Sequence, residues 1–146
     1  MITLAILQKM AADGVANLVA DKNFFWEEAP LQKNGEPAQG VWIVTRGGNL
    51  NNTPKGLNQR TIADFYIAFN DKTKTETVAR DIIDWIRHNL GICELRGVVG
   101  DSRYAFANIR IRPTTSPSNQ GVTSNGLIVK MTSAELYYDQ INQQED

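Results

Sequence analysis

Residues 65–86 read FYIAFNDKTKTETVARDIIDWI, and within this stretch a strand pattern changes into a helix pattern across one polar turn. Before the turn, apolar residues occupy alternate positions, which is typical of a strand with one buried face. In residues 78–90, apolar residues recur every three or four positions, as in an amphipathic helix. Thr73 and Glu76 fit a capping box at the helix start, and Gly91 suits the residue that ends it. The stretch therefore predicts a strand joined directly to the helix that packs on it.

A second helix and further strands are expected around this junction. Residues 2–20 carry apolar side chains three or four positions apart, with polar residues between them. The β-rich runs are VWIVT at 41–45, CELRGVV at 93–99, RYAFANIRIR at 103–112 and LIVKMTSAELYY at 127–138. This order predicts an α+β fold, in which two helices pack on one face of a mostly antiparallel, roughly five-stranded sheet. The other face of the sheet is expected to be open.

The chain of 146 residues, 42% of them hydrophobic, has the size of one globular domain with one core. We expect a single α+β domain over residues 1–138 and a polar C-terminal tail over 139–146. Two stretches rich in Gly, Asn, Ser and Pro, at about 46–59 and 113–126, are predicted to be flexible loops. Residues 21–40 lack periodicity, and we predict an irregular connection whose three aromatic residues lie under the core.

The composition predicts a soluble protein that is not exported. No apolar run approaches the roughly 18 residues of a membrane span, and the N-terminal residues lack a basic leader followed by an apolar segment. Cys93 is the only cysteine, so no disulfide forms within the chain, which fits a reducing compartment. Its simplest interpretation is a small core residue.

No residues form a recognisable catalytic or metal-binding pattern. The motifs GxSxG, HExxH, CxxC, GxGxxG and GxxxxGK[ST] are absent. His88 is the only histidine, and it stands among charged residues at the end of a predicted helix. The closely spaced carboxylates in the sequence lack the hydrophobic context that raises a carboxyl pKa for acid catalysis. We therefore predict no enzymatic activity, no cofactor and no metal.

Basic residues are concentrated in the middle of the chain. Residues 1–40 hold three basic and five acidic residues, residues 41–130 hold twelve and seven, and residues 131–146 hold four acids and no base, so that the net charge is −1. This asymmetry favours complementary contacts between copies of the chain or passing contact with a polyanion. It is too weak for a dedicated nucleic-acid binder.

Several basic residues are candidates for contact with partners. Arg110 and Arg112 share one face of a predicted strand, and Lys130 on the last strand is placed beside them. A solvated sheet face is the simpler interpretation. The functional one is that these arginines meet carboxylates of a neighbouring subunit, for which the planar guanidinium is suited. The candidate subunit, partner or lumen contacts are Arg46, Lys55, Arg60, Arg110, Arg112 and Lys130.

The layout resembles that of the tail terminator proteins of long-tailed bacteriophages, which are also described as minor capsid or minor tail proteins. The matching features are an N-terminal helix, a Gly/Asn-rich segment leading to Arg60 and TIADFYIAFN, the helix TVARDIIDWIRHNL, and a last strand introduced by SNG and ending AELYYD. The similarity covers about residues 57–138 best, and it is one of pattern and order.

The resemblance implies a virion structural subunit assembled in the host bacterial cytoplasm. Six copies would form a ring that caps the tail tube, stops its polymerisation and offers its other side to head-completion proteins. DNA would pass through the lumen without sequence-specific binding, and no membrane would be contacted. Three alternatives are another head-tail joining protein of the neck, a small nucleic-acid-binding domain that uses Arg110 and Arg112, and an enzyme with a pocket around Trp26 and Trp42.

Overall fold

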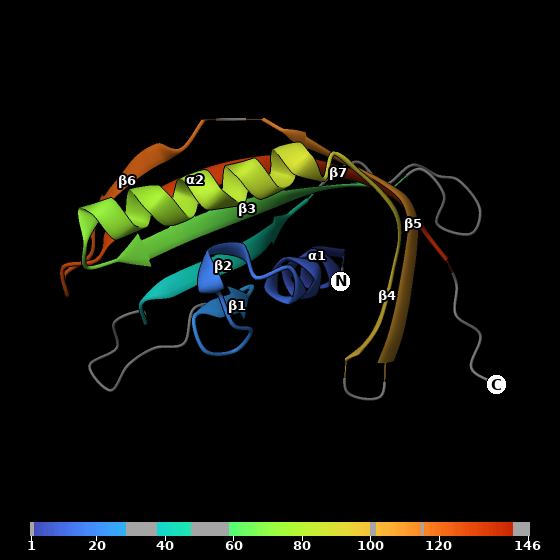
Figure 1. Cartoon of the computed structure of the whole chain (residues 1–146), viewed down its shortest axis with the longest axis horizontal. Coiled ribbons are helices and arrows are strands. Elements are labelled where there is room, and N and C mark those ends of the chain that lie inside the picture. The colour runs from blue at the N-terminus through green and yellow to red at the C-terminus, as the bar shows by residue number, and fades with distance from the viewer. Residues whose placement is uncertain (1, 29–37, 48–58, 100–101, 115, 142–146) are drawn as a thin grey trace.

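The structure is a computed structural model that describes residues 2–28, 38–47, 59–99, 102–114 and 116–141 (Figure 1). The elements in chain order are α1 (Ile2–Ala12), the short 3-10 helix η1 (Val15–Asn17), β1 (Phe24–Trp26), β2 (Gly40–Arg46), β3 (Gln59–Phe69), α2 (Lys72–His88), β4 (Gly91–Val99), β5 (Ser102–Pro113), β6 (Ser118–Val122) and β7 (Ile128–Gln140).

The sheet is larger than the sequence predicted, and it is mixed. It has seven strands in the order β1-β2-β3-β7-β5-β4, with β6 paired to β7. β1 pairs parallel to β2, and all other pairs are antiparallel. The sheet curls into a half-barrel, so that β4 and β5 bend around the end of α1 (Figure 1). The prediction of two helices on a roughly five-stranded, mostly antiparallel sheet is therefore wrong.

β1 and β6 are the strands that the sequence analysis missed. β1 is three residues long, which is too short for an alternating pattern to be seen, and its carbonyl and amide groups join it to β2. β6 lies inside the predicted loop 113–126, and all five of its residues are exposed. It pairs with β7 through its backbone and one Ser118 hydroxyl, and a strand with no buried side chain shows no alternating pattern in the sequence.

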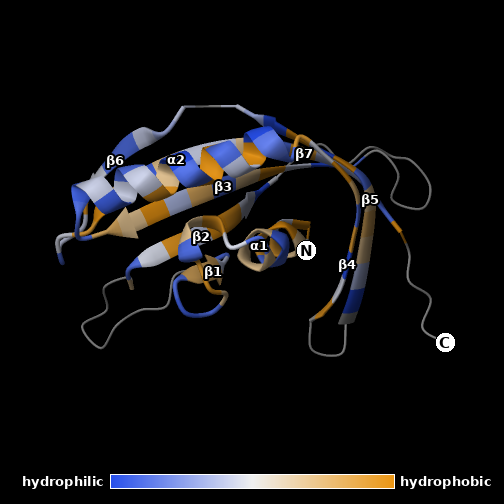
Figure 2. Cartoon of the chain, in the orientation of Figure 1, coloured by the Kyte–Doolittle hydropathy of each residue, from blue (hydrophilic) through white to orange (hydrophobic). Residues whose placement is uncertain are grey.

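One hydrophobic core lies on the concave face of the sheet and includes residues of both helices (Figure 2). Phe65 and Ile67 of β3 and Phe106 of β5 are almost fully buried there, beneath Ile82 of α2 and Leu7 of α1. Burying side chains of this size stabilises the fold by about 1.5–3 kcal/mol each. A second, smaller cluster on the opposite face contains Ala68, Leu127 and Val129, so that face is covered in part.

The β3–α2 junction is confirmed as strand and helix, but its caps differ from the prediction. Asp71 is the N-cap, and its carboxylate accepts from the Thr73 amide at 2.8 Å. Glu76 instead forms an ion pair with Lys130 at 3.8 Å. The helix ends at His88, and the C-cap is Asn89, whose side chain donates to the Trp85 carbonyl at 2.8 Å. The predicted capping box and the predicted role of Gly91 are therefore wrong.

The first helix stops earlier than the predicted residues 2–20. α1 ends at Ala12, and Gly14 follows with a φ of 74°, in the left-handed region that favours glycine. Val15 and Leu18 are still buried, because η1 and the following turn bring them back to the core. The apolar spacing in the sequence continues to Leu18, so it gives no indication that the helix ends at Ala12.

The curl of the sheet depends on an irregularity in β5. The register between β5 and β7 shifts between Ala107 and Arg110, where two residues of β5 lie opposite Tyr138. Asn108 takes a left-handed φ of 51° there, which asparagine tolerates better than most residues. Such a bulge bends its strand and increases the local twist. The β4–β5 hairpin is thereby directed across α1.

Other predictions on domain organisation have a mixed outcome. Most of the predicted loop 46–59 and residues 142–146 of the predicted tail lie outside the described residues. Asp139 and Gln140 belong to β7. Phe24 and Phe25 are buried as predicted, whereas Trp26 is partly exposed. No helix in the described part of the chain has the length and apolarity to cross a membrane.

Candidate functional site

The candidate site is a group of charged residues on the face of the sheet opposite the helices. Strand alternation places Arg60 of β3, Glu135 and Tyr137 of β7, and Arg110 and Arg112 of β5 on this face. We call these five residues the arginine cluster. Arg60 and Arg110 both pair with Tyr137, from the strands on either side of it. Three guanidinium groups and one carboxylate give the cluster a net charge of +2.

Arg60 is held inside the cluster by Glu135. Its Nε donates to the carboxylate at 3.2 Å, and the Tyr137 hydroxyl donates to the same carboxylate. The hydrogen bond from Tyr137 and then that from Arg60 lower the pKa of Glu135. The bond with Glu135 raises the pKa of Arg60 in turn. The pair stays charged over the physiological range, and its orientation is fixed by the strands.

Arg110 and Arg112 are exposed and form no ion pair within 4 Å among the described residues, although Arg112 pairs with Glu135 in the sheet register and its charge helps to lower the pKa of that carboxyl. The Arg110 guanidinium lies 5.8 Å from the centre of the Tyr137 ring, within the range of a cation–π contact. Together with Tyr137 the two arginines line a hollow of about 350 Å³. Their donors are therefore available to an external anion.

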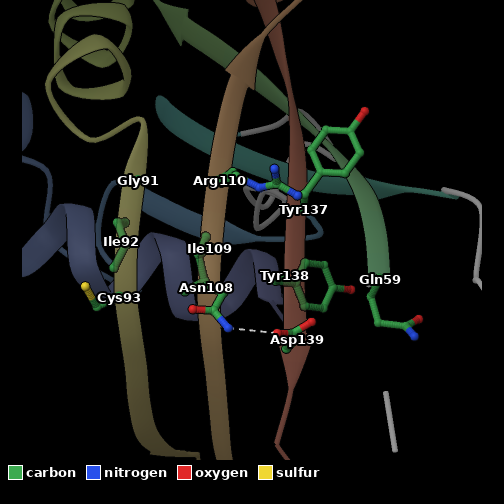
Figure 3. A pocket seen from close by; sticks show the side chains of 10 residues that line it. All are labelled: Gln59, Gly91, Ile92, Cys93, Asn108, Ile109, Arg110, Tyr137, Tyr138 and Asp139. Atoms are coloured by element: carbon green, nitrogen blue, oxygen red, sulfur yellow. Dashed lines mark hydrogen bonds between the residues drawn. The ribbon is translucent and has the colours of Figure 1, made fainter. Parts of the chain in front are cut away.

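A larger open hollow of about 790 Å³ adjoins the cluster (Figure 3). Arg110 and Tyr137 belong to its wall, together with residues at the β5 bulge and at the start of β4. Asn108 donates to the Asp139 carboxylate at 2.9 Å across the bulge. Cys93 lies on the β4 side and is exposed, so the expectation that it is a core residue is wrong. The hollow is open to solvent, and its wall contains one positive group, Arg110, and one negative group, Asp139.

Arg46 lies on the same face, but its guanidinium is paired with Asp64. It donates two hydrogen bonds to Asp64, at 3.0 and 3.1 Å, and the Ser133 hydroxyl donates to the same carboxylate at 2.5 Å. The bond with Asp64 raises the pKa of Arg46. Asp64 is buried while Arg46 remains more than half exposed. This triad fixes β2, β3 and β7 relative to one another.

The remaining two predicted contact residues are not part of the cluster. Lys130 pairs with Ile67 in the sheet register, and its ammonium lies against Glu76 of α2, so it points to the helix side of the sheet. The prediction that Lys130 lies beside Arg110 and Arg112 is wrong. Lys55 lies outside the described residues.

The side chains that orient the arginines were not predicted from the sequence. Glu135, Tyr137 and Asp64 were not among the candidates, although Glu135 and Tyr137 alternate with buried Leu136 and Tyr138 in AELYYD. That alternation is the signal that places them on the open face. The bulge at Asn108 has no comparable signal, since asparagine also occurs in regular turns.

Other groups considered for chemistry occupy structural positions. The Trp26 indole donates to Thr3 of α1 at 2.8 Å, whereas Trp42 stacks on Tyr66 on the open face with ring centres 5.4 Å apart. The two tryptophans point to opposite sides of the sheet and do not line one pocket. His88 is exposed and contacts the Asp84 carbonyl. The described residues contain no group of three or more His, Cys, Asp or Glu side chains that would hold a metal.

No family model, curated protein or solved structure matches this chain. The functional conclusion therefore depends on the geometry of the open face and on the sequence pattern.

Proposed function

We propose that this chain is a non-enzymatic virion structural protein, the tail terminator of a long-tailed bacteriophage. In this role six copies form a ring on the finished tail tube, stop its polymerisation and present the opposite side to head-completion proteins. The observation that supports this proposal most directly is the arginine cluster, in which rigid strands hold two exposed, unpaired guanidinium groups. Such groups suit contact with carboxylates of a neighbouring protein surface better than they suit catalysis.

The two edges of the sheet support assembly by a head-to-tail contact. A closed ring needs two different patches on each subunit, because one patch of a copy meets the other patch of the next. β1 is a three-residue parallel edge, and β4 is a nine-residue antiparallel edge. The edges therefore differ in length, direction and side chains, as such a contact requires.

The charge is compatible with DNA passing through the ring lumen. The chain has a net charge of −1 and a pI of about 5.8, so it lacks the strong basicity that gives tight binding to phosphates. The two arginines of the cluster that lack an ion pair attract a passing polyanion only weakly at physiological salt. The protein would act in the virion after assembly in the bacterial cytoplasm, and no cofactor is needed for this role.

Another head-tail joining protein of the phage neck is the first alternative, and a nucleic-acid-binding domain is the second. Both would use the same cluster. The nucleic-acid alternative is less favoured, because Glu135 neutralises Arg60 and leaves only two arginines for phosphates.

The proposal is tested with the tail-tube protein from the same phage genome. Tubes are polymerised with and without this chain, and their lengths and ends are measured by electron microscopy. We expect shorter tubes whose ends carry six-fold rings. The variant Arg110→Gln with Arg112→Gln should cap tubes poorly, whereas Arg80→Gln with Arg87→Gln, on α2, should cap them normally. Tubes that grow to the same length and carry no ring, at any ratio of the two proteins, would contradict the proposal.

A further inference from the structure

Exposed arginines and carboxylates that lack an ion pair lie mostly on different elements of the described chain, although the exposed Lys22 stands beside Asp21 and Arg80 is next to Asp81 on α2. Among the described arginines, those without an ion pair are Arg80, Arg103, Arg110 and Arg112, and three of these four lie on β5. Among the described acids, those without an ion pair or a side-chain hydrogen bond are Asp21, Glu28 and Asp81, and the first two flank β1. Every other described carboxylate already has an internal partner.

The topology places these two sets on different flanks of the sheet. β1 is the first strand in the sheet order and β5 is the last but one, with β2, β3 and β7 between them. α1 contacts both β1 and β4, so it fills the space between the two flanks on the concave side (Figure 1). A single copy therefore cannot bring Asp21 or Glu28 to Arg110.

We propose that the contact between neighbouring copies is charge-paired: Arg110 and Arg112 of one copy receive the carboxylates of Asp21 and Glu28 of the next. This inference rests on the proposed ring and names the surfaces that would build it. The contact is head-to-tail, because the basic patch is on β5 and the acidic patch is at β1. Until the ring closes, an open assembly has one free basic patch at one end and one free acidic patch at the other.

The chemistry of the cluster favours a carboxylate as the occupant. Arg46 and Arg60 each already hold a carboxylate on the same face, at 3.0 and 3.2 Å, so guanidinium–carboxylate pairing is the geometry that this face uses. Arg110 and Arg112 are two positions apart on one strand, which separates their side chains by roughly 7 Å. Asp21 and Glu28 lie on either side of β1, so in this contact each arginine receives one carboxylate.

The proposal is tested by reversing the charges of each patch and then restoring association with the complementary variant. Self-association of the full-length chain is measured by sedimentation velocity, at low salt and without tube protein. The basic-patch variant carries Arg110→Glu and Arg112→Glu, and the acidic-patch variant carries Asp21→Lys and Glu28→Lys. Each should weaken self-association about tenfold or more, because like charges then face each other. Mixing the two variants should restore association, since one then presents two acidic patches and the other two basic patches. The chain that carries all four changes should also self-associate.

Matched controls lie on α2. Arg80→Glu with Arg87→Glu changes the net charge as the basic-patch variant does, and Asp81→Lys with Asp84→Lys matches the acidic-patch variant. Neither control should change self-association, and circular dichroism should show that all variants are folded. Added salt should weaken the wild-type contact.

Three results would overturn the charge-paired contact: a wild-type chain that stays monomeric at millimolar concentration, reversal variants that associate like the controls, or reversal without rescue. Loss of binding to a DNA oligonucleotide in the basic-patch variant, with unchanged self-association, would assign the cluster to nucleic acid instead. Failure of the charge-paired contact can be told apart from failure of the proposed function, because tube capping is measured in a separate experiment. If tubes are still capped, other surfaces of the chain build the ring.

Discussion

The Tyr104 ring on β5 lies directly against the backbone of Gly97 on β4. A Cβ atom added to Gly97 would be 2.2 Å from the Tyr104 hydroxyl oxygen and 2.3 Å from the ring carbon that bears it. The Tyr104 hydroxyl donates to the Gln8 side chain of α1, and its ring stacks on Phe106 with centres 5.7 Å apart. Tyr104 thus fastens the curled hairpin to the first helix, and it needs the space above Gly97 to do so.

We predict that Gly97→Ala destabilises the protein by about 1–3 kcal/mol, the usual cost of overpacking. The added methyl group forces Tyr104 out of its place between β4 and α1. Urea denaturation followed by circular dichroism measures the effect. Gly91→Ala is the control, because nothing lies within 4 Å of a Cβ at Gly91. Equal stability of the two variants would show that Tyr104 does not occupy this position.

The triad of Arg46, Asp64 and Ser133 gives a second prediction. The Asp64 side chain is 8% exposed, so Arg46 and Ser133 supply the hydrogen bonds that water would otherwise give to its oxygens. Arg46→Gln should cost about 1 kcal/mol, at the upper end for a pair with an exposed partner. Arg112→Gln, on the same face but without an ion pair, should stay within about 0.5 kcal/mol of wild type. Equal losses in urea denaturation would disprove a specific role for the triad.

The elements that could be predicted from sequence are those whose side chains alternate between water and core. β3 and α2 were recognised because one shows a period of two and the other a period near 3.6. β6 could not be recognised, since all five of its side chains are exposed and none of them alternates with a buried one. The half-barrel could not be predicted either, because it depends on the bulge at Asn108, and a bulge produces no periodic pattern in the sequence.

The candidate site was predictable to a similar extent. Arg110 and Arg112 were correctly placed on one face, because the strand is regular from residue 110 onward. Lys130 was placed on the wrong face, although it lies an even number of residues from buried Leu136 and must share its side of the strand. Glu135 was overlooked because its role follows from the Arg60 side chain, 75 residues away, whose proximity depends on the β3–β7 register.

A third prediction concerns stability at low pH. The Trp85 indole of α2 donates to the Asp13 carboxylate at 2.9 Å, and this hydrogen bond lowers the pKa of Asp13 below its ordinary value. A carboxyl whose pKa is lower in the folded state contributes stability at neutral pH, and that stability is lost as the pH falls through the folded-state pKa. Trp85→Phe should therefore destabilise the protein at pH 7 more than at pH 3.

Trp26→Phe is the control for this pH dependence. It removes an indole hydrogen bond to the uncharged Thr3 hydroxyl, which reaches the Glu27 carboxylate only through Thr45, so its cost should depend on pH less than that of Trp85→Phe. Urea denaturation at pH 7 and pH 3 measures all three proteins. If Trp85→Phe lowers the free energy of unfolding as much at pH 3 as at pH 7, the bond does not lower the pKa of Asp13.

The single cysteine gives a fourth prediction, which links the larger hollow to assembly. Cys93 is exposed on β4 and lines the same hollow as Arg110, so a bulky group attached there would project over the basic patch of the proposed contact. We expect a maleimide bearing a large polar group to react readily with the free chain, to leave it folded and to weaken self-association. Val122→Cys in a Cys93→Ser background is the control, because Val122 is also highly exposed but lies on β6. Native mass spectrometry of both labelled proteins measures the effect. Normal association of the chain labelled at Cys93, with loss only for the chain labelled at Val122, would move the contact from the β4–β5 flank to β6.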